Sequence, residues 1–117
     1  MMIAHSLPDP FFGPAQQLHG ATYITDVVFS SKTLNSHNVV IDIGKAHEIL
    51  TEALAPLQYK NLDEIPHFKG HLTTTEFLAK YIHDRIKEKV KGHFEGPVSV
   101  ILGESHIASA TYSDDTP

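Results

Sequence analysis

Three residues stand out in the sequence for the chemistry they could perform: His5, His19 and Glu104. The chain holds nine histidines in 117 residues, and imidazole is a common zinc ligand, so a metal is the first hypothesis. His5 and His19 each lie at or near a predicted strand, in "MMIAHSL" and "LHGATY", and could converge on one site. Two imidazoles alone make a weak zinc site, because catalytic zinc normally has three protein ligands and a water. Histidines that only satisfy hydrogen bonds near strand ends remain the alternative.

The other histidines give no metal signature. His67 and His71 are four residues apart, which would suit a helix face, but Pro66 and Gly70 indicate that "IPHFKGH" is a loop. No HExxH motif or comparable second element accompanies them, so we expect both to be exposed to solvent. The remaining histidines in polar surroundings are predicted to lie on the surface: His37, His47, His83 and His93.

Glu104 lies in "LGESHIA", between two apolar runs, where a carboxylate is costly to bury unless something donates to it. A ligand with two adjacent N–H donors would suit it, and an exposed turn glutamate is the alternative. Two other acidic residues have structural explanations. Glu76 stands three residues after Thr73, which is the spacing of a capping box, and Asp42 can cap the helix that follows it.

Two strands are predicted before the first helix. The residues of "ATYITDVVF", 21–29, are mostly β-branched or aromatic, which is typical of a strand. The polar run 30–38 indicates a hairpin loop, because "NVVIDI" follows with alternating apolar residues. We therefore predict a second strand over 39–43 that pairs back antiparallel.

Two helices and a second hairpin follow. Apolar residues recur at three- and four-residue spacing from Ala46 to Leu57, with Pro56 at the end, and this predicts an amphipathic helix. The segment 73–92 combines the capping-box spacing, an apolar stripe and a glycine behind a lysine-rich end. "PVSVILGES" and "IASATY" predict two closing strands with Gly103 to His106 at the turn.

The predicted class is α+β, with a four-stranded antiparallel sheet and both helices on one face. A chain of 117 residues, 41 % of them hydrophobic, has material for one core, so we expect a single domain over 1–117. A small sheet with one uncovered face and two open edges hides its edges most directly by assembly. We therefore expect a homo-oligomer.

Charge and cysteine content limit the partners and the compartment. The formal net charge is −5, with no sustained basic surface, so neither nucleic acid nor a membrane surface is favoured as a partner. The absence of cysteine removes disulfides, thiolate zinc sites and a cysteine nucleophile, and suits a reducing compartment. The sequence has no apolar run near the roughly 20 residues of a membrane-spanning helix, so we expect a soluble, unprocessed cytoplasmic protein.

Six segments, taken in order and spacing, resemble the 6-pyruvoyltetrahydropterin synthase and 6-carboxytetrahydropterin synthase family: "IAHSL", "LHGATY", "VIDIGKAHEIL", "LQYKNLDEI", "TTTEFLAKYI" and "ESHIASATY". The resemblance covers nearly the whole chain. It implies the T-fold, whose subunits join their sheets into a barrel and typically form a hexamer of two stacked trimers. Family members carry several more residues of first strand, so the resemblance also implies that the first strand of this chain is truncated.

The resemblance also implies a site with altered chemistry. In the family, three histidines hold zinc; His5 and His19 match two of them, and Ala21 stands where the third belongs. The catalytic cysteine is replaced by Ala15, and an Asp-His pair is replaced by Gln58 and Tyr59. Alanine neither takes a proton nor binds metal, so the usual lyase reaction is not expected. The only nearby proton-transfer candidates are Tyr59, His106 and the two site histidines, and no cofactor is expected beyond a possible zinc ion.

The pterin-recognition part of the family pattern is retained. Glu104 matches the glutamate that binds the amino-pyrimidine edge, and Thr74 and Thr75 match residues of the pocket near the same ring. The leading hypothesis is a homo-oligomer, a hexamer by resemblance, that binds a pterin-like or purine-like ring without the standard synthase reaction. Two alternatives stay open: an active zinc-dependent lyase of the 6-carboxytetrahydropterin synthase type with a rearranged site, and a non-catalytic structural oligomer.

Overall fold

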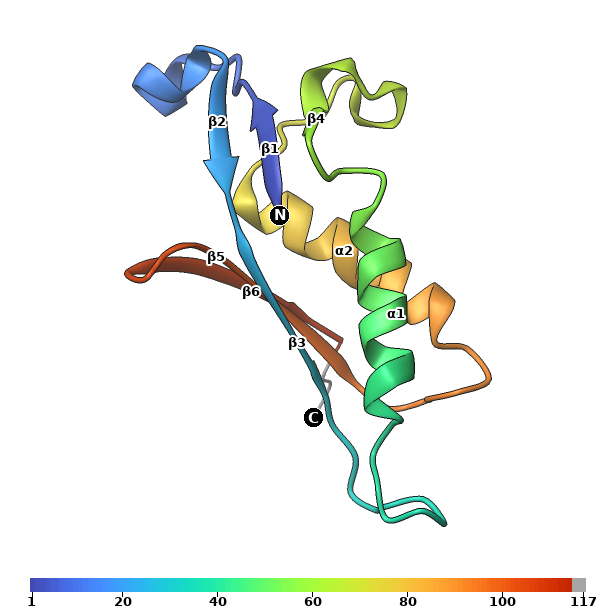
Figure 1. The fold of residues 1–117 in the computed structure, drawn as a ribbon. Helices are drawn as coiled ribbons and strands as arrows, with labels where there is room; N and C mark the ends of the chain where they lie inside the picture. The colour runs from blue at the N-terminus through green and yellow to red at the C-terminus, as the bar shows by residue number, and fades with distance from the viewer. Residues whose placement is uncertain (115–117) are drawn as a thin grey trace.

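The computed structural model describes residues 1–114 and places six strands in two three-stranded sheets (Figure 1). The first sheet has the order β2-β1-β4 and the second has the order β3-β5-β6. The strands are β1 (Met2–His5), β2 (His19–Thr22), β3 (Ile24–Phe29), β4 (Lys60–Asn61), β5 (Val98–Ser105) and β6 (Ala108–Ser113). The helices are α1 (Ile43–Leu54) and α2 (Thr75–Lys89), with short 3-10 turns at Pro10–Gln16, Leu62–Glu64 and Pro66–Phe68.

The α+β class is confirmed, but the strand arrangement differs from the single four-stranded antiparallel sheet that the sequence predicts. Residues 39–43 form no strand. Asn38 has a positive φ of 62°, and the amide of Asn35 donates to the carbonyl of Val39, which closes a tight loop. Asp42 then caps α1 at once, so too few residues remain for a strand. Instead, β4 pairs in parallel with β1.

The single strand predicted over 21–29 is divided at Tyr23, where the chain passes from one sheet to the other. β2 pairs with β1, and β3 pairs with β5, both antiparallel. Between them, the amide of Tyr23 donates to the carbonyl of Met1 at 2.7 Å. The terminal amine of Met1 donates back to the carbonyl of Tyr23 at 2.8 Å. The backbone of Tyr23 is therefore fixed where the two sheets meet.

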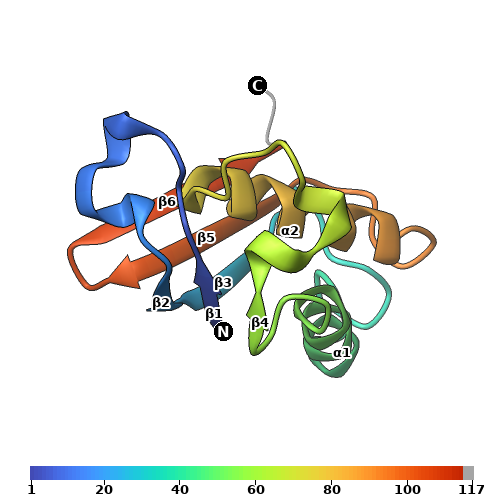
Figure 2. The same cartoon turned by 90° about the horizontal axis from the view of Figure 1, so that it is seen from above.

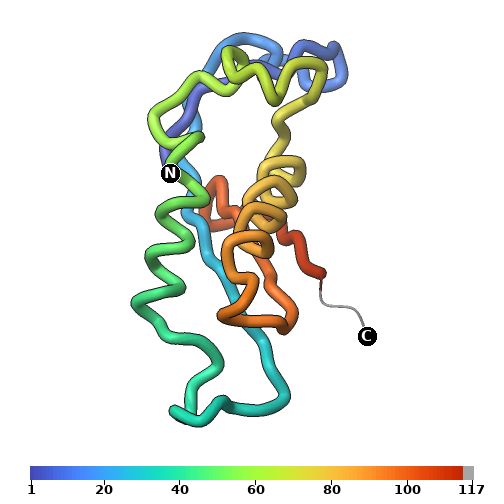
Figure 3. Tube along the Cα trace, turned by 90° about the vertical axis from the view of Figure 1, so that its right-hand side faces the viewer, coloured from blue at the N-terminus to red at the C-terminus, as the bar shows by residue number. Residues whose placement is uncertain are grey.

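Both helices lie on one face of the β3-β5-β6 sheet, as predicted (Figures 2 and 3). α2 packs on β5 and β6, and α1 packs beside α2. The predicted apolar stripes form the core, with fully buried residues from three elements: Ile49 and Ala53 of α1, Leu78, Ile82 and Ile86 of α2, and Val98, Val100 and Leu102 of β5. The predicted closing hairpin is confirmed as β5 and β6, but its turn lies at His106 and Ile107 rather than from Gly103 to His106, because Gly103 and Ser105 still pair with β6.

The helix caps correct one prediction. Asp42 caps α1 as expected, because its carboxylate accepts from the amide of Lys45 at 2.8 Å. In α2, however, the cap is Thr74, whose hydroxyl accepts from the amide of Phe77 at 3.1 Å, rather than Thr73. Thr73 is buried and its hydroxyl instead contacts the ring of His5. The shift by one residue turns Thr73 from a helix cap into part of the candidate site.

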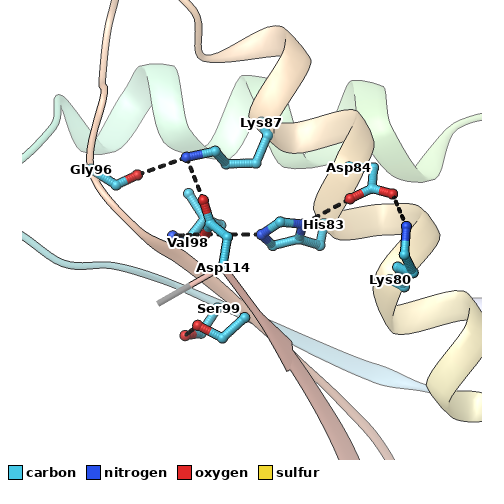
Figure 4. A network of polar contacts seen from close by, with 9 residues as sticks. Lys80, His83, Asp84, Lys87, Gly96, Val98, Ser99 and Asp114 are labelled. Carbon is cyan, nitrogen blue, oxygen red and sulfur yellow. Dashed lines mark hydrogen bonds and ion pairs between the residues drawn. The ribbon is translucent and has the colours of Figure 1, made fainter. Parts of the chain in front are cut away.

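A partly buried polar network ties α2 to the start of β5 and the end of β6 (Figure 4). His83 is only 3 % exposed, so the prediction that it lies on the surface is wrong. Its Nε2 lies 3.0 Å from the carboxylate of Asp114, which also accepts from the amide of Val98 and binds Lys87 at 2.7 Å. Partial burial opposes ionisation of Asp114, but these hydrogen bonds outweigh it and hold the pKa of that carboxyl well below its usual range.

The other surface predictions for histidine agree with the structure. The five exposed histidines are His37, His47, His67, His71 and His93.

Within residues 1–114, no helix is both long and apolar enough to cross a membrane.

Candidate functional site

A cavity of about 250 Å³ lies where the first sheet meets the N-terminal end of α2 and the far end of β5. Its polar lining comes from β1, β2, the Tyr23 junction, α2 and β5: His5, His19, Tyr23, Thr74, Thr75, Glu76 and Glu104. The structure thus brings together the predicted histidine pair and the predicted ligand-binding residues. A larger hollow of about 430 Å³ between β3 and α1 is lined mainly by apolar side chains. Its lining includes neither the histidine pair nor the predicted ligand-binding residues.

His5 and His19 are cross-strand partners in the antiparallel pair of β1 and β2. Their ring centroids lie 4.6 Å apart in an edge-to-face arrangement. The Nδ1 atom of His5 lies 3.0 Å from the hydroxyl of Thr73, and Nδ1–H of His19 donates to the carbonyl of Gln17 at 2.8 Å. Because a carbonyl can only accept, the neutral ring of His19 has its lone pair on Nε2.

Burial decides the ionisation of His5. The side chain is 2 % exposed, and burial lowers the pKa of this imidazole below its ordinary value of 6.5, with the neighbouring His19 lowering it further. The hydrogen bond to Thr73 and the carboxylates of Asp63 and Glu104 oppose the shift without reversing it. His5 is therefore a neutral ring in the folded protein at pH 7.

The donors present do not fit a catalytic zinc ion. Ala21 lies two residues after His19 on the same face of β2 and pairs with Ile3, so the position for which the resemblance implies a third ligand carries only a methyl group. Among residues 1–114, no group of three His, Asp or Glu side chains is placed to hold a metal. Two imidazoles fall one short of the three protein ligands of catalytic zinc sites.

Glu104 owes its position to an irregularity in the hairpin. The register of β5 and β6 shifts between Gly103, which pairs with Ser109, and Ser105, which pairs with Ala108. Glu104 is the extra residue in this bulge, and bulges often re-aim a side chain next to a functional site. Its exposed carboxylate lines the cavity and also an adjoining hollow of about 190 Å³ beside β6. It forms no ion pair with any side chain of residues 1–114.

The N-terminal end of α2 forms a further part of the cavity wall. Thr74 caps the helix, and Thr75 and Glu76 begin its first turn. The first amides of a helix have no partner inside the helix and carry partial positive charge. This wall therefore offers hydroxyl and backbone donors beside the carboxylate acceptors of Glu76 and Glu104.

The weak catalytic candidates lie outside the cavity of the single chain. Tyr59 is 78 % exposed with a φ of 59°, and His106 is exposed at the tip of the β5–β6 hairpin. Gln58 accepts from the amide of Met2 at 2.8 Å, which is a structural contact. Asp63 likewise accepts from the amide and hydroxyl of Ser6, at 3.1 and 2.6 Å. The catalytic roles of Tyr59 and His106 stay predictions.

Two polar lining residues are not predicted as site residues from the sequence: Tyr23 and Glu76. Tyr23 fits the pattern of a strand residue, and the available signal is that His19, Ala21 and Tyr23 alternate and thus point to one face. The capping-box spacing explains Glu76 without a function, so it gives no sign that this residue lines the cavity. Ala15 also lines the cavity, as the resemblance implies for that position.

Comparison with known proteins decides the family, because the family model described as 6-pyruvoyl tetrahydropterin synthase matches residues 1–115. The chain belongs to the 6-pyruvoyl tetrahydropterin synthase family. A curated relative, the 6-pyruvoyl tetrahydrobiopterin synthase of Dictyostelium discoideum, is 30 % identical over 82 residues. These residues are 68 % of this chain and only 61 % of that relative.

Solved structures confirm that the chain has the fold of this family, the T-fold. The 6-pyruvoyl tetrahydropterin synthase of Caenorhabditis elegans matches with a TM-score of 0.84 and 21 % identity, over 98 % of this chain and 90 % of that one. The enzyme of the same name from Plasmodium vivax matches with a TM-score of 0.72 and 16 % identity, over 99 % and 91 %. At these identities, the structural likeness concerns the fold alone.

Proposed function

We propose that this member of the family binds a pterin-like or purine-like ring in the cavity through Glu104 and no longer performs the standard synthase reaction. The observation that carries the proposal is the composition of one cavity. It combines Glu104 with Thr74 and Thr75, while Ala15 contributes only a methyl group. Recognition groups are present, and Ala15 stands in the lining where the family pattern has its catalytic cysteine.

The placement of Glu104 supports ring recognition. A carboxylate without an ion-pair partner among residues 1–114 is free to accept two adjacent N–H groups of a flat heterocycle, a strong and directional contact. Thr74 and Thr75 line the same cavity at the N-terminal end of α2. A carboxylate and hydroxyl donors in one cavity suit a ring that carries both N–H groups and acceptor atoms.

The lack of a complete acid–base set supports the loss of the standard reaction. Of the titratable groups on the wall, His5 is buried and neutral and is bonded to Thr73. Tyr59 and His106 lie outside the cavity in the single chain. A general base must reach the proton that it abstracts, directly or through one water.

The proposed assembly is a homo-oligomer, a hexamer by analogy with the family, with sheets joined into a barrel. The two edge strands of the β3-β5-β6 sheet, β3 and β6, pair with no further strand within residues 1–114. Large apolar side chains are also exposed, including Phe11 at 86 % and Ile107 at 84 %. Free edges and exposed apolar side chains are both features that assembly covers.

The cytoplasm remains the proposed compartment, since the chain has no cysteine.

Titration of the full chain with neopterin tests the proposal. Glu104→Gln keeps the size of the side chain and removes its charge, so we expect affinity to fall about ten- to hundredfold, the range of about 1.5–3 kcal/mol for a hydrogen bond to a charged group. Glu88→Gln, on the exposed side of α2, is the matched control and should bind like the wild type. Equal affinity of the wild type and Glu104→Gln would contradict the proposal.

The histidine pair favours a second candidate, an active zinc-dependent lyase with a rearranged site. The Nδ1 atoms of His5 and His19 are both hydrogen bonded, which leaves the two Nε2 atoms as possible ligands. Elemental analysis of protein purified without chelator separates the candidates. One zinc per chain would favour the lyase, and a small fraction of one zinc supports the proposed function. A purely structural oligomer predicts no ring binding in the wild type.

A further inference from the structure

The hydroxyl of Tyr23 is a buried polar group without a hydrogen-bond partner among residues 1–114. The side chain is 1 % exposed and forms part of the cavity wall. Buried tyrosine hydroxyls normally find a partner, because an unpaired polar group in a low-dielectric interior is costly. Neither the packing of β2 and β3 nor the cap of α2 requires this hydroxyl, so its presence is unexplained by the fold.

The surroundings of the hydroxyl make it a hydrogen-bond donor rather than an acceptor. Burial raises the pKa of the Tyr23 phenol above its ordinary value of 10.0, and the negative charges of Glu104 and Glu76 raise it further. Thr75 is close enough to oppose the shift, but its side chain and the hydroxyl do not meet in hydrogen-bonding geometry. Tyr23 therefore keeps its proton at neutral pH, on the wall of a cavity that also holds Glu104.

We propose that the Tyr23 hydroxyl donates a hydrogen bond to a ring carbonyl oxygen of the bound ligand and so selects oxo-substituted rings over rings with an amino group at that position. This inference rests on the proposed function, since it assumes that a ring binds through Glu104. The two residues act on neighbouring atoms of one ring edge. The carboxylate accepts from N–H groups, and the phenol donates to the adjacent oxygen. Tyr23 is thus a specificity-determining residue.

Thr25 provides a control for this assignment. The hydroxyl of Thr25 is the other buried side-chain polar atom without a partner in the described part of the chain, and it lies on the wall of the hollow between β3 and α1. It shares no cavity with Glu104. Thr25 is therefore a matched control, because Thr25→Val removes an unpaired hydroxyl away from the site.

The test uses Tyr23→Phe and two probes, pterin and 2,4-diaminopteridine, with affinity measured by titration. Pterin has a ring carbonyl that accepts a hydrogen bond, and the diamino ring has an amino group there instead. We expect Tyr23→Phe to bind pterin about tenfold more weakly, in keeping with the loss of one hydrogen bond. We expect its affinity for the diamino ring to be unchanged or higher. The two rings also present different edges to Glu104, so their affinities are not compared with each other. The diagnostic quantity is the ratio of dissociation constants of Tyr23→Phe and the wild type, taken separately for each ring.

The free protein supplies an independent readout. Removal of an unpaired buried hydroxyl should leave the thermal unfolding midpoint of Tyr23→Phe unchanged or raised, and Thr25→Val should behave in the same way while binding both rings like the wild type. A lowered midpoint for Tyr23→Phe would overturn the inference, because it would mean that the hydroxyl has a partner in the free protein. In the titrations, an equal loss of affinity for both rings in Tyr23→Phe, or no loss of affinity for pterin, would also overturn the inference.

The failure of this inference can be told from the failure of the proposed function. If the wild type binds pterin in a Glu104-dependent way and Tyr23→Phe binds it equally well, only the role of Tyr23 is wrong. If the wild type binds neither ring, or if Glu104→Gln binds pterin as tightly as the wild type does, the proposed function is wrong. The role of Tyr23, which depends on it, is then wrong as well.

Discussion

The ring of His5 and the hydroxyl of Thr73, 68 residues apart in the chain, meet at 3.0 Å in a buried contact. The contact joins β1 to the residue just before the cap of α2, and so connects the histidine wall of the cavity to the wall that carries Thr74 and Thr75. We predict that Thr73→Val, which keeps the shape and removes the hydroxyl, lowers the free energy of unfolding by about 1–3 kcal/mol, because a buried imidazole nitrogen loses its partner.

Urea unfolding at neutral pH measures this loss. Thr51→Val, at an exposed position of α1, is the matched control and should change the free energy of unfolding by less than about 0.5 kcal/mol. If the two variants were equally stable, the contact between His5 and Thr73 would be unimportant for the cavity.

The lowered pKa of His5 predicts a pH dependence of stability. Burial is the main cause of the shift, and the unfolded chain binds a proton at this ring more readily than the folded one does. The contribution of neutral His5 is therefore fully present above its unfolded pKa of 6.5 and is lost as the pH falls towards the lower, folded pKa. Urea midpoints at pH 7.5, 6.5 and 5.5 should fall more steeply for the wild type than for His5→Asn. Parallel curves would show that His5 does not cause the dependence.

The network around Asp114 should stabilise the junction of α2 with β5 and β6. We predict that Asp114→Asn lowers the free energy of unfolding by about 1–2 kcal/mol, because contacts to Lys87 and His83 lose a charged acceptor. Asp84→Asn, whose carboxylate is 51 % exposed, should cost less than about 0.5 kcal/mol. Thermal unfolding compares the two variants. Equal losses would mean that the partly buried network adds nothing beyond a surface ion pair.

The same carboxylate should contribute to acid sensitivity. Its folded pKa is depressed, so its stabilising effect is present above the unfolded pKa of 3.8 and is lost as the pH falls below that value. In acid unfolding followed by circular dichroism, the wild type should lose stability below about pH 4 more steeply than Asp114→Asn. If Asp114→Asn lost stability below about pH 4 as steeply as the wild type does, Asp114 would not be a cause of the acid sensitivity.

The proposal that Ala21 stands in place of a third zinc ligand can be tested by placing a histidine there. Ala21 shares a face of β2 with His19, so Ala21→His places a third imidazole beside the existing pair. We predict that this variant binds about one zinc per chain, as three-histidine sites do, while the wild type binds markedly less. Elemental analysis after dialysis against limited zinc gives the ratio. Stoichiometric zinc in the wild type would mean that another donor already compensates for Ala21.

Local patterns predicted much of the fold correctly. The apolar spacing of 46–57 and 73–92 and the two closing apolar runs identify both helices and the last hairpin, because these depend on neighbours in the sequence, although the turn itself lies later than predicted. The failures are non-local. β4 is only two residues long and exists because the chain after α1 returns to β1, with Tyr59 in the left-handed region. His83 is buried because Asp114, 31 residues later, provides its partner.

The candidate site divides in the same way. The types of His5, His19 and Glu104 suggested their roles, and the structure places all three on one cavity. The unpaired state of the Tyr23 hydroxyl and the bulge at Glu104 depend on packing and register between distant segments. Only a structure supplies these two facts.

The central claim is that ring recognition is retained without the metal chemistry of the family. The most direct test is the dissociation constant of neopterin for the wild type and for Glu104→Gln, both treated with EDTA. We predict that the metal-free wild type binds the ring and that Glu104→Gln binds it about ten- to hundredfold more weakly. Loss of wild-type binding on EDTA treatment, or equal binding by the two proteins, would contradict the claim.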